Sequence, residues 1–276
     1  FVHTLTKLIR KEGVQVRCLP GVEYILDGKV SITEFNLASI EGVLNRQEIS
    51  LMTYSDRRFF YKRNILVAGG GGSIGSELCR QIDLCNPDNL IIIDHSEFNL
   101  YSVMEYFEAN NSVKTKNIVP ILGSTTDSKL INNVIKKYNV DIIFHAAAYK
   151  HVPLVEDNIS SSTKNNILGT KVLCDSALEN SVNSFTLISS DKAVRPTNVM
   201  GASKRICELL LQAHASNKSK TIFSMVRFGN VLNSSGSVVP KFLKQLKNGG
   251  PLTVTHPDIM RYFMTIEEAA SLVIKS

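Results

Sequence analysis

Residues 64–77 decide the fold; they read NILVAGGGGSIGSE. An apolar run (65–68) enters a turn of glycines, and a helical pattern begins at Ser73. Glycine permits the tight turn and lets backbone N–H groups approach a pyrophosphate, and the N-terminus of the helix adds a favourable partial charge. This order of strand, turn and helix predicts a dinucleotide site, whereas the alternative is a flexible surface loop. The residues expected to hold the dinucleotide here are Gly69, Gly72, Ser73, Ile74 and Gly75.

Apolar strands and amphipathic helices alternate beyond this stretch. Strands are expected at 65–68, 90–94, 118–122, 141–146 and 185–189. Helices are expected from Ser73, from Glu97, from Asp127 and, as one long helix, from about residue 157 to residue 179. Continuous apolar strands separated by helices predict a parallel sheet covered on both faces, which is a doubly wound α/β fold. After residue 221 the irregular stretches 229–239 and 249–257 predict a small C-terminal substrate lobe.

Composition places the chain among globular proteins. Its 276 residues are 43% hydrophobic and 20% charged, without a low-complexity tract, which argues against disorder, a fibrous protein and a solenoid. The net charge of +6 is spread along the chain, so an acidic small substrate or an anionic membrane surface accounts for it better than nucleic acid does. The five cysteines include no C-x-x-C pair, so we expect reduced thiols and no metal site. No run of about 18 apolar residues is present, so we expect the chain itself to be soluble.

The second strand ends at Asp94, with His95 and Ser96 beside it. A carboxylate at this position accepts hydrogen bonds from the hydroxyls of an adenosine ribose and repels a 2′-phosphate, so the expected cofactor is NAD rather than NADP. Asp94 can instead cap the helix that begins at Glu97, and the two roles can coexist. The fourth strand ends in small residues against which a cofactor can lie, namely Ala146, Ala147 and Ala148.

The fifth strand leads into Ser190, Asp191 and Lys192, and the next helix opens with Met200 and Lys204. Ser190, Met200 and Lys204 have the layout of a short-chain dehydrogenase triad, with methionine where tyrosine normally stands. A thioether has no proton to exchange, so Met200 cannot act as the acid or base. A carboxyl group and an amine side by side can divide these roles, and we therefore expect Asp191 and Lys192 to carry the proton transfers. The alternative is a salt bridge within the loop.

Five strings of the sequence carry a resemblance to a known family. They are HAAAYKHVPLVEDN (145–158), NNILGTKVL (165–173), SSDKAVRPTNVMGASKR (189–205), VRFGNVLNSSGSVVPKF (226–242) and THPDIMRYFMTIEEAA (255–270). From about Gln15 onward the chain resembles the polysaccharide-biosynthesis branch of the extended short-chain dehydrogenases/reductases, and more narrowly the large membrane-anchored UDP-N-acetylglucosamine 4,6-dehydratases of bacteria. That group commonly has methionine at the position of Met200. Ala68 and Ser124 depart from the family's usual threonine and aspartate, and both departures concern cofactor binding.

The resemblance implies a hydro-lyase that uses NAD and UDP-N-acetylglucosamine. Hydride leaves C4 of the sugar, Lys192 removes the C5 proton, Asp191 protonates the departing C6 hydroxyl, and hydride returns to C6. Ser190 would hold O4, Lys204 would hold the nicotinamide ribose, and the configuration at C5 is expected to be retained. Residues expected to contact the substrate are Lys150, Asn230, Ser237, Val238 and Arg261. The alternatives are a solvated position for Lys150 and a structural role for Arg261.

The resemblance also implies how the chain is organised. Residues 1–62 are expected to be the tail of an upstream domain and a linker, residues 63–220 the NAD-binding Rossmann domain, and residues 221–276 part of a substrate-binding lobe. Transmembrane helices upstream of this chain would place the full-length protein at the cytoplasmic face of the inner membrane, where it acts in surface polysaccharide synthesis. Apolar residues on more than one face of the helices near 163–179 and 204–215 predict a homodimer or a higher homo-oligomer.

Two other functions remain open at this point. A nucleotide-sugar 4-epimerase shares the oxidation at C4 but needs no Asp191–Lys192 elimination pair. A catalytically silent NAD-binding module is suggested by Met200, Ala68 and Ser124 together. Product analysis separates the epimerase from the dehydratase, and any turnover of the nucleotide sugar removes the silent module.

Overall fold

The structure, a computed structural model, describes residues 53–109, 117–215, 220–232, 234, 238–254, 256, 258 and 260–276. The chain divides into two compact units, Phe1–Glu48 and Ile49–Ser276, and all of the described residues belong to the second. The expected upstream tail therefore lies mostly outside the described residues. Helix α4 (Tyr54–Phe60) is the first described element, and its Phe60 is buried in a core of the sheet domain. The expected domain boundaries stay predictions.

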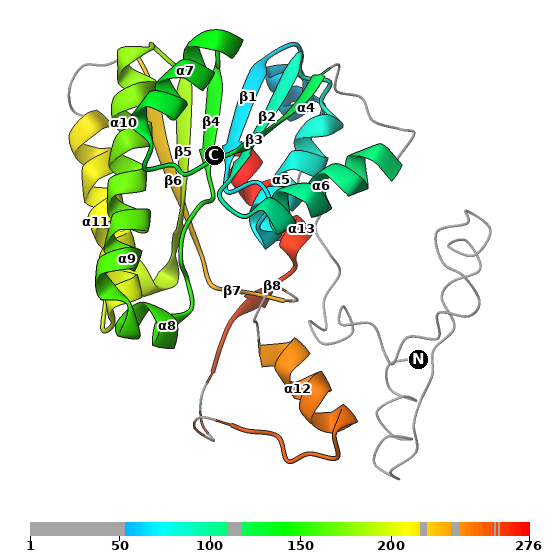
Figure 1. Ribbon diagram of the computed structural model, residues 1–276. Coiled ribbons are helices and arrows are strands. Elements are labelled where there is room, and N and C mark those ends of the chain that lie inside the picture. Colours follow the sequence, from blue (N-terminus) through cyan, green and yellow to red (C-terminus); the bar gives the residue numbers. More distant parts are fainter. Residues whose placement is uncertain are drawn as a thin grey trace. The chain divides into compact units, whose positions relative to one another are not determined.

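Parallel strands form a six-stranded sheet in the described part of the chain (Figure 1). They are β1 (Asn64–Ala68), β2 (Asn89–Asp94), β3 (Asn117–Leu122), β4 (Ile142–His145), β5 (Ser184–Ser190) and β6 (Ile222–Phe228). Their spatial order is β3-β2-β1-β4-β5-β6, so the chain moves from β1 to one edge and then returns to build the other half. This order is that of a doubly wound sheet, and it confirms the predicted fold class.

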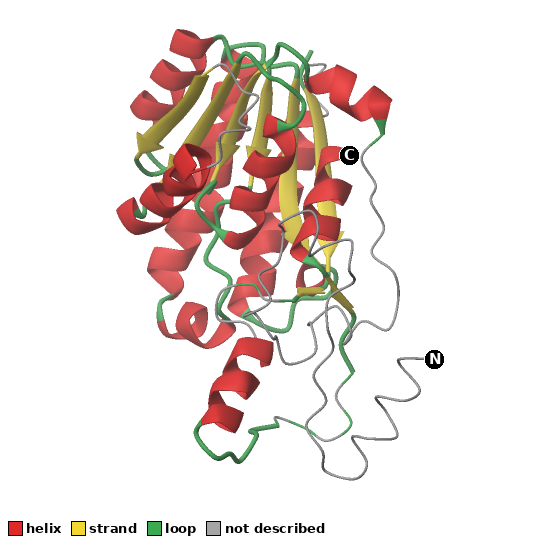
Figure 2. Ribbon diagram, turned by 90° about the vertical axis from the view of Figure 1, so that its right-hand side faces the viewer, coloured by secondary structure: helices red, strands yellow, loops and turns green. Residues whose placement is uncertain are grey.

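Helices cover both faces of the sheet because the strands are apolar on both sides. The covering helices are α5 (Ser73–Asp83), α6 (Glu97–Ala109), α7 (Ser128–Tyr138), α10 (Gly169–Glu179), α11 (Val199–Ala215) and α13 (Ile266–Ile274). Along β1, Ile65 and Val67 pack in one core with α5, α6 and α13, whereas Leu66 packs in the other with α7, α10 and α11. Figures 1 and 2 show the strands between these two layers of helices. The strand interiors thus fill two cores, and the polar groups of the site lie at the strand ends.

The long helix predicted from about residue 157 to residue 179 is interrupted. Helix α8 (Val152–Asp157) ends at Asn158, whose backbone φ of −132° and ψ of 52° are not helical. Helix α9 (Ile159–Thr163) then leads through a π-helical turn (Lys164–Leu168) into α10. The π-helical turn buries Asn166, and this residue supports the site described below.

Beyond β6 the chain forms a second, two-stranded parallel sheet from β7 (Asn230–Val231) and β8 (Phe263–Met264). Helix α12 (Val238–Lys247) lies between these strands in sequence, so the irregular stretch expected at 229–239 ends where α12 begins. The chain then returns to the large sheet, where α13 packs against α5. Among the described helices, none is both long enough and apolar enough to span a bilayer.

Candidate active site

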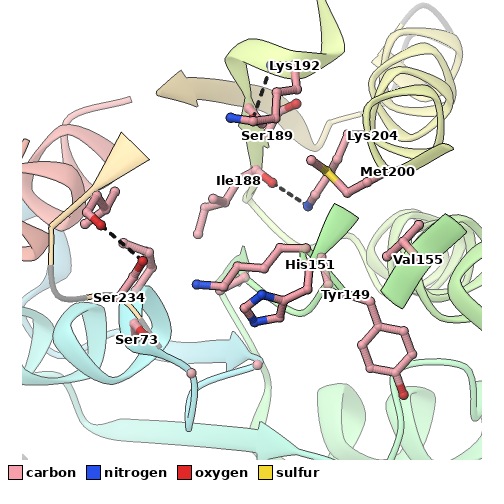
Figure 3. A pocket seen from close by; sticks show the side chains of 18 of the residues that line it. Ser73, Tyr149, His151, Val155, Ile188, Ser189, Lys192, Met200, Lys204 and Ser234 are labelled. Carbon is pink, nitrogen blue, oxygen red and sulfur yellow. Dashed lines mark hydrogen bonds between the residues drawn. The ribbon is translucent and has the colours of Figure 1, made fainter. Parts of the chain in front are cut away.

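The carboxyl ends of β1, β4, β5 and β6 open into a cavity of about 800 Å³. β1 and β4 are the neighbouring strands from which the two halves of the sheet are built outward, and ligands of open α/β sheets bind at this point. The cavity walls come from the glycine loop after β1, the β4–α8 segment, the end of β5, the start of α11 and the chain after β6. Figure 3 shows side chains from these segments around the cavity.

Most of the predicted site residues meet in this cavity. Those that line it are Gly69, Gly72, Ser73, Ile74, Gly75, Ala146, Ala148, Lys150, Ser190, Lys192, Met200, Lys204, Asn230 and Val238. Those that are described but lie outside its lining are Asp94, His95, Ser96, Ala147, Asp191 and Arg261. Ser237 lies outside the described residues. The fold therefore brings the glycine loop, the end of β5 and the start of α11 together, and the role of each residue stays a prediction.

The glycine loop requires glycine at two positions. Gly69 has a φ of +76°, and a Cβ there would lie 2.5 Å from the backbone nitrogen of Ala147. A Cβ at Gly75 would overlap the carbonyl oxygen of Gly69, so α5 could not approach β1 this closely. The N-cap residue of α5 is Gly72, and no side chain caps this end of the helix. A helix N-terminus without a side-chain cap suits an anionic group such as a pyrophosphate.

Asp94 is hydrogen-bonded to the glycine loop. Its side chain is buried, and its Oδ2 accepts a hydrogen bond from the N–H of Gly71 at 3.0 Å while Oδ1 accepts one from the N–H of Ser96 at 2.9 Å. At the start of α6, Ser96 Oγ accepts a hydrogen bond from the N–H of Asn99 at 3.3 Å. Asp94 therefore joins β2 to the glycine loop rather than capping α6. His95 Nδ1 lies 3.8 Å from Asp94 Oδ1. Contact of Asp94 with a ribose stays a prediction.

Asp191 and Lys192 form an ion pair at the end of β5. Lys192 Nζ donates to Asp191 Oδ1 at 3.0 Å and to Asn230 Oδ1 at 3.4 Å, and Ser190 Oγ donates to the same Asp191 oxygen at 2.9 Å. Burial alone would raise the pKa of Asp191, but the hydrogen bonds from Lys192 and Ser190 outweigh it and lower the pKa. The salt bridge considered from the sequence is thus present, and it lies at the cavity that Lys192 and Ser190 line.

Met200 and Lys204 are buried one helical turn apart on α11. Figure 3 shows the two side chains next to each other beside the end of β5. Lys204 Nζ donates a hydrogen bond to the carbonyl oxygen of Ile188 at 2.8 Å, and burial lowers the pKa of this amine. The thioether of Met200 has no proton to give. At this wall the groups that can exchange a proton are the lysine and the polar side chains at the end of β5, and their catalytic role stays a prediction.

Asn166 supports the cavity and was missed by the reasoning from sequence. Its buried side chain accepts a hydrogen bond from the N–H of Tyr149 at 2.8 Å and donates to the Tyr149 carbonyl at 3.1 Å. It also donates to Ser203 Oγ at 3.1 Å on α11. Asn166 thus joins α11 to the loop that carries Lys150, an amine whose pKa burial lowers. No local signal in the sequence points to it, because Asn166 follows the polar residues 160–165, whereas a buried amide is recognised by the partners that the fold brings to it.

His145 lies at the end of β4 and is 1% exposed. Its Nε2 is 2.9 Å from the Thr170 hydroxyl, which itself donates to the Asn166 carbonyl at 2.7 Å, so Nε2 carries the ring proton. Burial lowers the pKa of His145 to about 3, and the ring is therefore neutral near pH 7. His145 is not part of the cavity lining. These contacts favour a structural role for His145.

The two departures from the family pattern have local roles. Ala68 is buried at the end of β1 and pairs with His145 of β4. The Ser124 hydroxyl is hydrogen-bonded to the Thr126 hydroxyl at 2.8 Å.

Arg261, a predicted substrate contact, is exposed and donates to the carbonyl of Met260 at 2.8 Å. The described residues contain no group of three His, Cys, Asp or Glu side chains arranged to hold a metal ion.

Comparison with known proteins gives matches over most of the chain. The family described as "Polysaccharide biosynthesis protein" matches residues 65–276. The capsular polysaccharide biosynthesis protein CapD of Staphylococcus aureus is 41% identical over 275 residues, which cover 100% of this chain and 46% of CapD. The UDP-glucose 4-epimerase of Rickettsia canadensis is 32% identical over 219 residues, which cover 78% of this chain and 62% of that protein. The chain therefore spans about half the length of CapD.

A solved structure matches the sheet domain as well. The X-ray structure of Pen from Bacillus thuringiensis superposes with a TM-score of 0.73 and 33% sequence identity. The match covers 79% of this chain and 65% of Pen. Both the sequence and the fold of this chain are therefore similar to those of Pen.

Proposed function

This chain belongs to the polysaccharide biosynthesis protein family, and from that premise we propose that it is the catalytic part of an NAD-dependent nucleotide-sugar 4,6-dehydratase. The proposed substrate is UDP-N-acetylglucosamine and the product is UDP-2-acetamido-2,6-dideoxy-4-hexulose, with retained configuration at C5, for surface polysaccharide synthesis. The observation that carries the proposal is the Asp191–Lys192 pair at the cavity, beside a residue, Met200, that cannot exchange a proton.

NAD fits the residues at the start of the cavity. Gly69 and Gly75 give the close approach of loop, strand and helix that a pyrophosphate requires, and the N-terminus of α5 has no competing side-chain cap. The Asp94 carboxylate fixes the loop and disfavours a 2′-phosphate nearby. When bound, NAD would supply the hydride acceptor for the oxidation at C4 of the sugar and the hydride donor for the reduction at C6. Lys204, buried at the opposite wall, is the proposed ligand of the nicotinamide ribose.

The hydrogen bond between Lys192 and Asp191 suggests how the pair becomes active. In this bond Lys192 is the donor and Asp191 the acceptor, which is the reverse of the roles needed for base and acid. Moving one proton along this bond produces a neutral amine beside a carboxylic acid. Exclusion of water by the bound sugar favours this neutral pair, because burial disfavours charged forms. Lys192 then removes the C5 proton, which the C4 carbonyl has made acidic, and Asp191 protonates the departing C6 hydroxyl.

The remaining polar groups of the cavity are assigned to substrate orientation. Ser190 is proposed to donate a hydrogen bond to O4 as it becomes a carbonyl. Asn230 was expected to contact uridine or phosphate, and its contact with Lys192 Nζ adds a second proposed role, which is to orient that amine. Lys150 is the proposed cation for the diphosphate, because it is a basic residue that lines the cavity. Val238 and Ser237 remain proposed contacts of the nucleotide.

A 4-epimerase is the second candidate, and the 32% identity to a UDP-glucose 4-epimerase favours it. The two reactions share the oxidation at C4, but an epimerase returns hydride to C4 and has no use for an acid and a base at C5 and C6. The ion pair at Lys192 therefore favours the dehydratase. A silent NAD-binding module is the third candidate, because Met200 replaces the usual tyrosine.

The test is incubation of the full-length protein with UDP-N-acetylglucosamine and analysis of the product by mass spectrometry and NMR. The dehydratase yields a product lighter by one water molecule, with a methyl group at C6 and a ketone at C4. An isomer of unchanged mass would instead identify an epimerase, and no turnover at all would identify the silent module. An L-configured C5 in the dehydrated product would refute the proposed retention.

We also propose that the full-length protein is held at the cytoplasmic face of the inner membrane by a region outside this chain. The support is the resemblance to membrane-anchored dehydratases and the 46% coverage of CapD, which leaves room for a further region. Fractionation of cells that express the full-length protein tests this placement, and recovery in the soluble fraction would contradict it.

A further inference from the structure

Glu208 is a buried carboxylate behind the cavity wall, one helical turn after Lys204 on α11. Its side chain is 0% exposed and accepts hydrogen bonds from Ser189 Oγ at 2.6 Å, from Arg227 Nε at 2.7 Å and Nη2 at 2.5 Å, and from Arg205 Nη1 at 2.9 Å. Burial alone would raise the pKa of Glu208, but the hydrogen bonds from Arg227, Ser189 and Arg205 lower it to about 2. Glu208 is therefore a carboxylate at every physiological pH.

The partners of Glu208 belong to the segments that carry the site. Ser189 directly precedes Ser190 at the end of β5, and Arg227 is its partner across the β5–β6 pairing. The chain of β6 continues from Arg227 to Asn230 at the cavity. Glu208 itself lies on α11, which carries Met200 and Lys204. One carboxylate thus holds three separate segments together immediately behind their site residues.

Two side chains of α11 form hydrogen bonds with successive residues of β5, Ile188 and Ser189. Lys204 donates to the backbone carbonyl of Ile188, and Glu208 accepts from the side chain of Ser189 (Figure 3 shows the first of these bonds). The next residues of the strand are Ser190, which lines the cavity, and the Asp191–Lys192 pair. A hydroxyl hydrogen bond to a charged, immobile carboxylate is among the stronger neutral-donor bonds in proteins. It fixes the end of β5 where the backbone leaves the sheet.

We propose that Glu208 is a positioning residue, which through Ser189 and Arg227 sets the placement of the Ser190–Lys192 segment relative to Lys204. The proposal rests on the proposed function for its kinetic test. It assigns no contact between Glu208 and the substrate, because Glu208 is not part of the cavity lining. Its effect reaches the reaction through geometry and through the charge that it places near Lys204.

The charge of Glu208 provides a second readout. Burial lowers the pKa of Lys204, and the negative charges near it, Glu208 among them, act in the opposite direction. A purely structural contact would leave this titration unchanged when the charge alone is removed. Glu208→Gln keeps the size of the side chain and removes the charge, so the titration midpoint of Lys204 should fall.

The kinetic test removes the strand-end bond without disturbing the ion pairs. In the full-length protein, Ser189→Ala should lower kcat for UDP-N-acetylglucosamine about tenfold with KM changed less than about twofold, because one buried hydrogen bond is lost and the geometry at the end of β5 loosens. Ser189→Thr keeps the hydroxyl and should restore most of the rate. Arg205→Ala is the matched control: it removes another single bond to Glu208, leaves the Arg227 fork and Ser189 in place, and should change kcat less than about twofold.

Isotope-labelled lysine NMR on the same protein follows Lys204 in wild type and in Glu208→Gln. Wild-type kcat in Ser189→Ala, or equal losses in Ser189→Ala and Arg205→Ala, would overturn the positioning role. An unchanged Lys204 midpoint in folded Glu208→Gln would overturn the electrostatic part. Should Glu208→Gln fail to fold because the buried side chain loses its ion pairs with Arg205 and Arg227, the Ser189 series decides alone. If the wild-type protein does not dehydrate the sugar, the proposed function has failed, and the Lys204 titration still tests Glu208.

Discussion

Several polar side chains at and beside the cavity form hydrogen bonds within the protein. Asp94 accepts from Gly71, Asp191 accepts from Lys192, and Lys204 donates to the backbone of β5. Hydrogen bonds of this kind fix the orientation of each group, so that little reorganisation is required when charge develops in the reaction. A truncation at one of these residues therefore changes the shape of the site as well as its chemistry, and conservative variants are needed beside it.

The carboxylate of Asp94 gives a prediction on cofactor choice. The unmodified chain should bind NAD more tightly than NADP, because the carboxylate repels a 2′-phosphate. Asp94→Ala should weaken NAD binding about tenfold and reduce the preference, since it also removes the acceptor for the Gly71 N–H. Asp94→Asn keeps an acceptor oxygen without the charge, so it should lose the preference with a smaller loss of affinity. Calorimetric titration checks this, and equal or tighter binding of NADP by the unmodified chain would contradict it.

The site could be predicted only where its chemistry is local in sequence. The glycine turn, Ser190, Lys192, Met200 and Lys204 could be predicted as candidates because strand ends and spacing identify them, and all of them line the cavity. Asn166 and Glu208 were missed because their roles depend on partners from other elements. Asn166 is hydrogen-bonded to Tyr149, and Glu208 is hydrogen-bonded to Arg227. A lone asparagine or glutamate on a predicted helix resembles any solvent-facing residue until the fold places it.

The same limit holds for whole elements. The strands and the helices that follow them were predicted well, because continuous apolar runs, the glycine turn and the Asp127 cap of α7 are local signals. The interruption between α8 and α10 was not predicted, because the π-helical turn is stabilised by distant contacts: the Asn166 carbonyl accepts from Cys207 Sγ and the Asn166 side-chain amide donates to Ser203 Oγ, both on α11. Residues 160–166 are polar, so no apolar pattern in this stretch marks where one helix ends and the next begins.

Strand β4 carries a prediction on acid stability. The pKa of His145 is lowered to about 3 in the folded chain and returns to the ordinary value near 6.5 on unfolding. Between these values the unfolded chain binds a proton that the folded chain does not, so the free energy of unfolding falls as the pH falls. The fall from pH 6.5 to pH 5 should be about 2 kcal/mol. Denaturant unfolding as a function of pH measures it.

The matched variant for this prediction is His145→Gln, which removes the titrating ring but keeps a polar side chain beside Thr170. Its free energy of unfolding should be nearly independent of pH between 6.5 and 5, whatever its absolute stability. The pKa of Glu208 is lowered from 4.5 to about 2, so its titration changes the free energy of unfolding mainly below this pH range. An equal slope in wild type and His145→Gln would show that another group causes the pH dependence.

At the scale of the whole molecule, the helices around α11 present an apolar surface. Ile206 and Leu209 are exposed on α11, whereas Val172, Leu173 and Leu211, apolar residues of the two helices predicted to pair, are buried in the core. The predicted pairing surface is therefore narrower than the sequence suggested. Exposed apolar residues on adjacent helices are typical of surfaces that associate, and a homodimer stays our prediction.

Light scattering tests this association. The chain should have a dimer mass at high micromolar concentration, and Leu209→Glu should raise the dissociation constant at least about tenfold, because it places a charge in an apolar contact. Phe98→Glu is the control, since Phe98 is 76% exposed on α6, outside the predicted pairing helices. A monomer mass for the unmodified chain, or the same effect from both variants, would count against pairing through α11.

The central claim is that Lys192 and Asp191, rather than position 200, perform the proton transfers of a dehydration. The most direct measurement is NMR of the full-length protein turning over UDP-N-acetylglucosamine in D₂O, which follows deuterium at C5 together with the 4-keto product. Lys192→Ala should abolish C5 exchange and slow product formation by about 10²–10⁴, as expected for a lost general base. Asp191→Asn should impair elimination while some exchange persists, and Met200→Ala should be much milder than either. Near-native turnover in Lys192→Ala, or a dead Met200→Ala enzyme beside an active Lys192→Ala one, would contradict the claim.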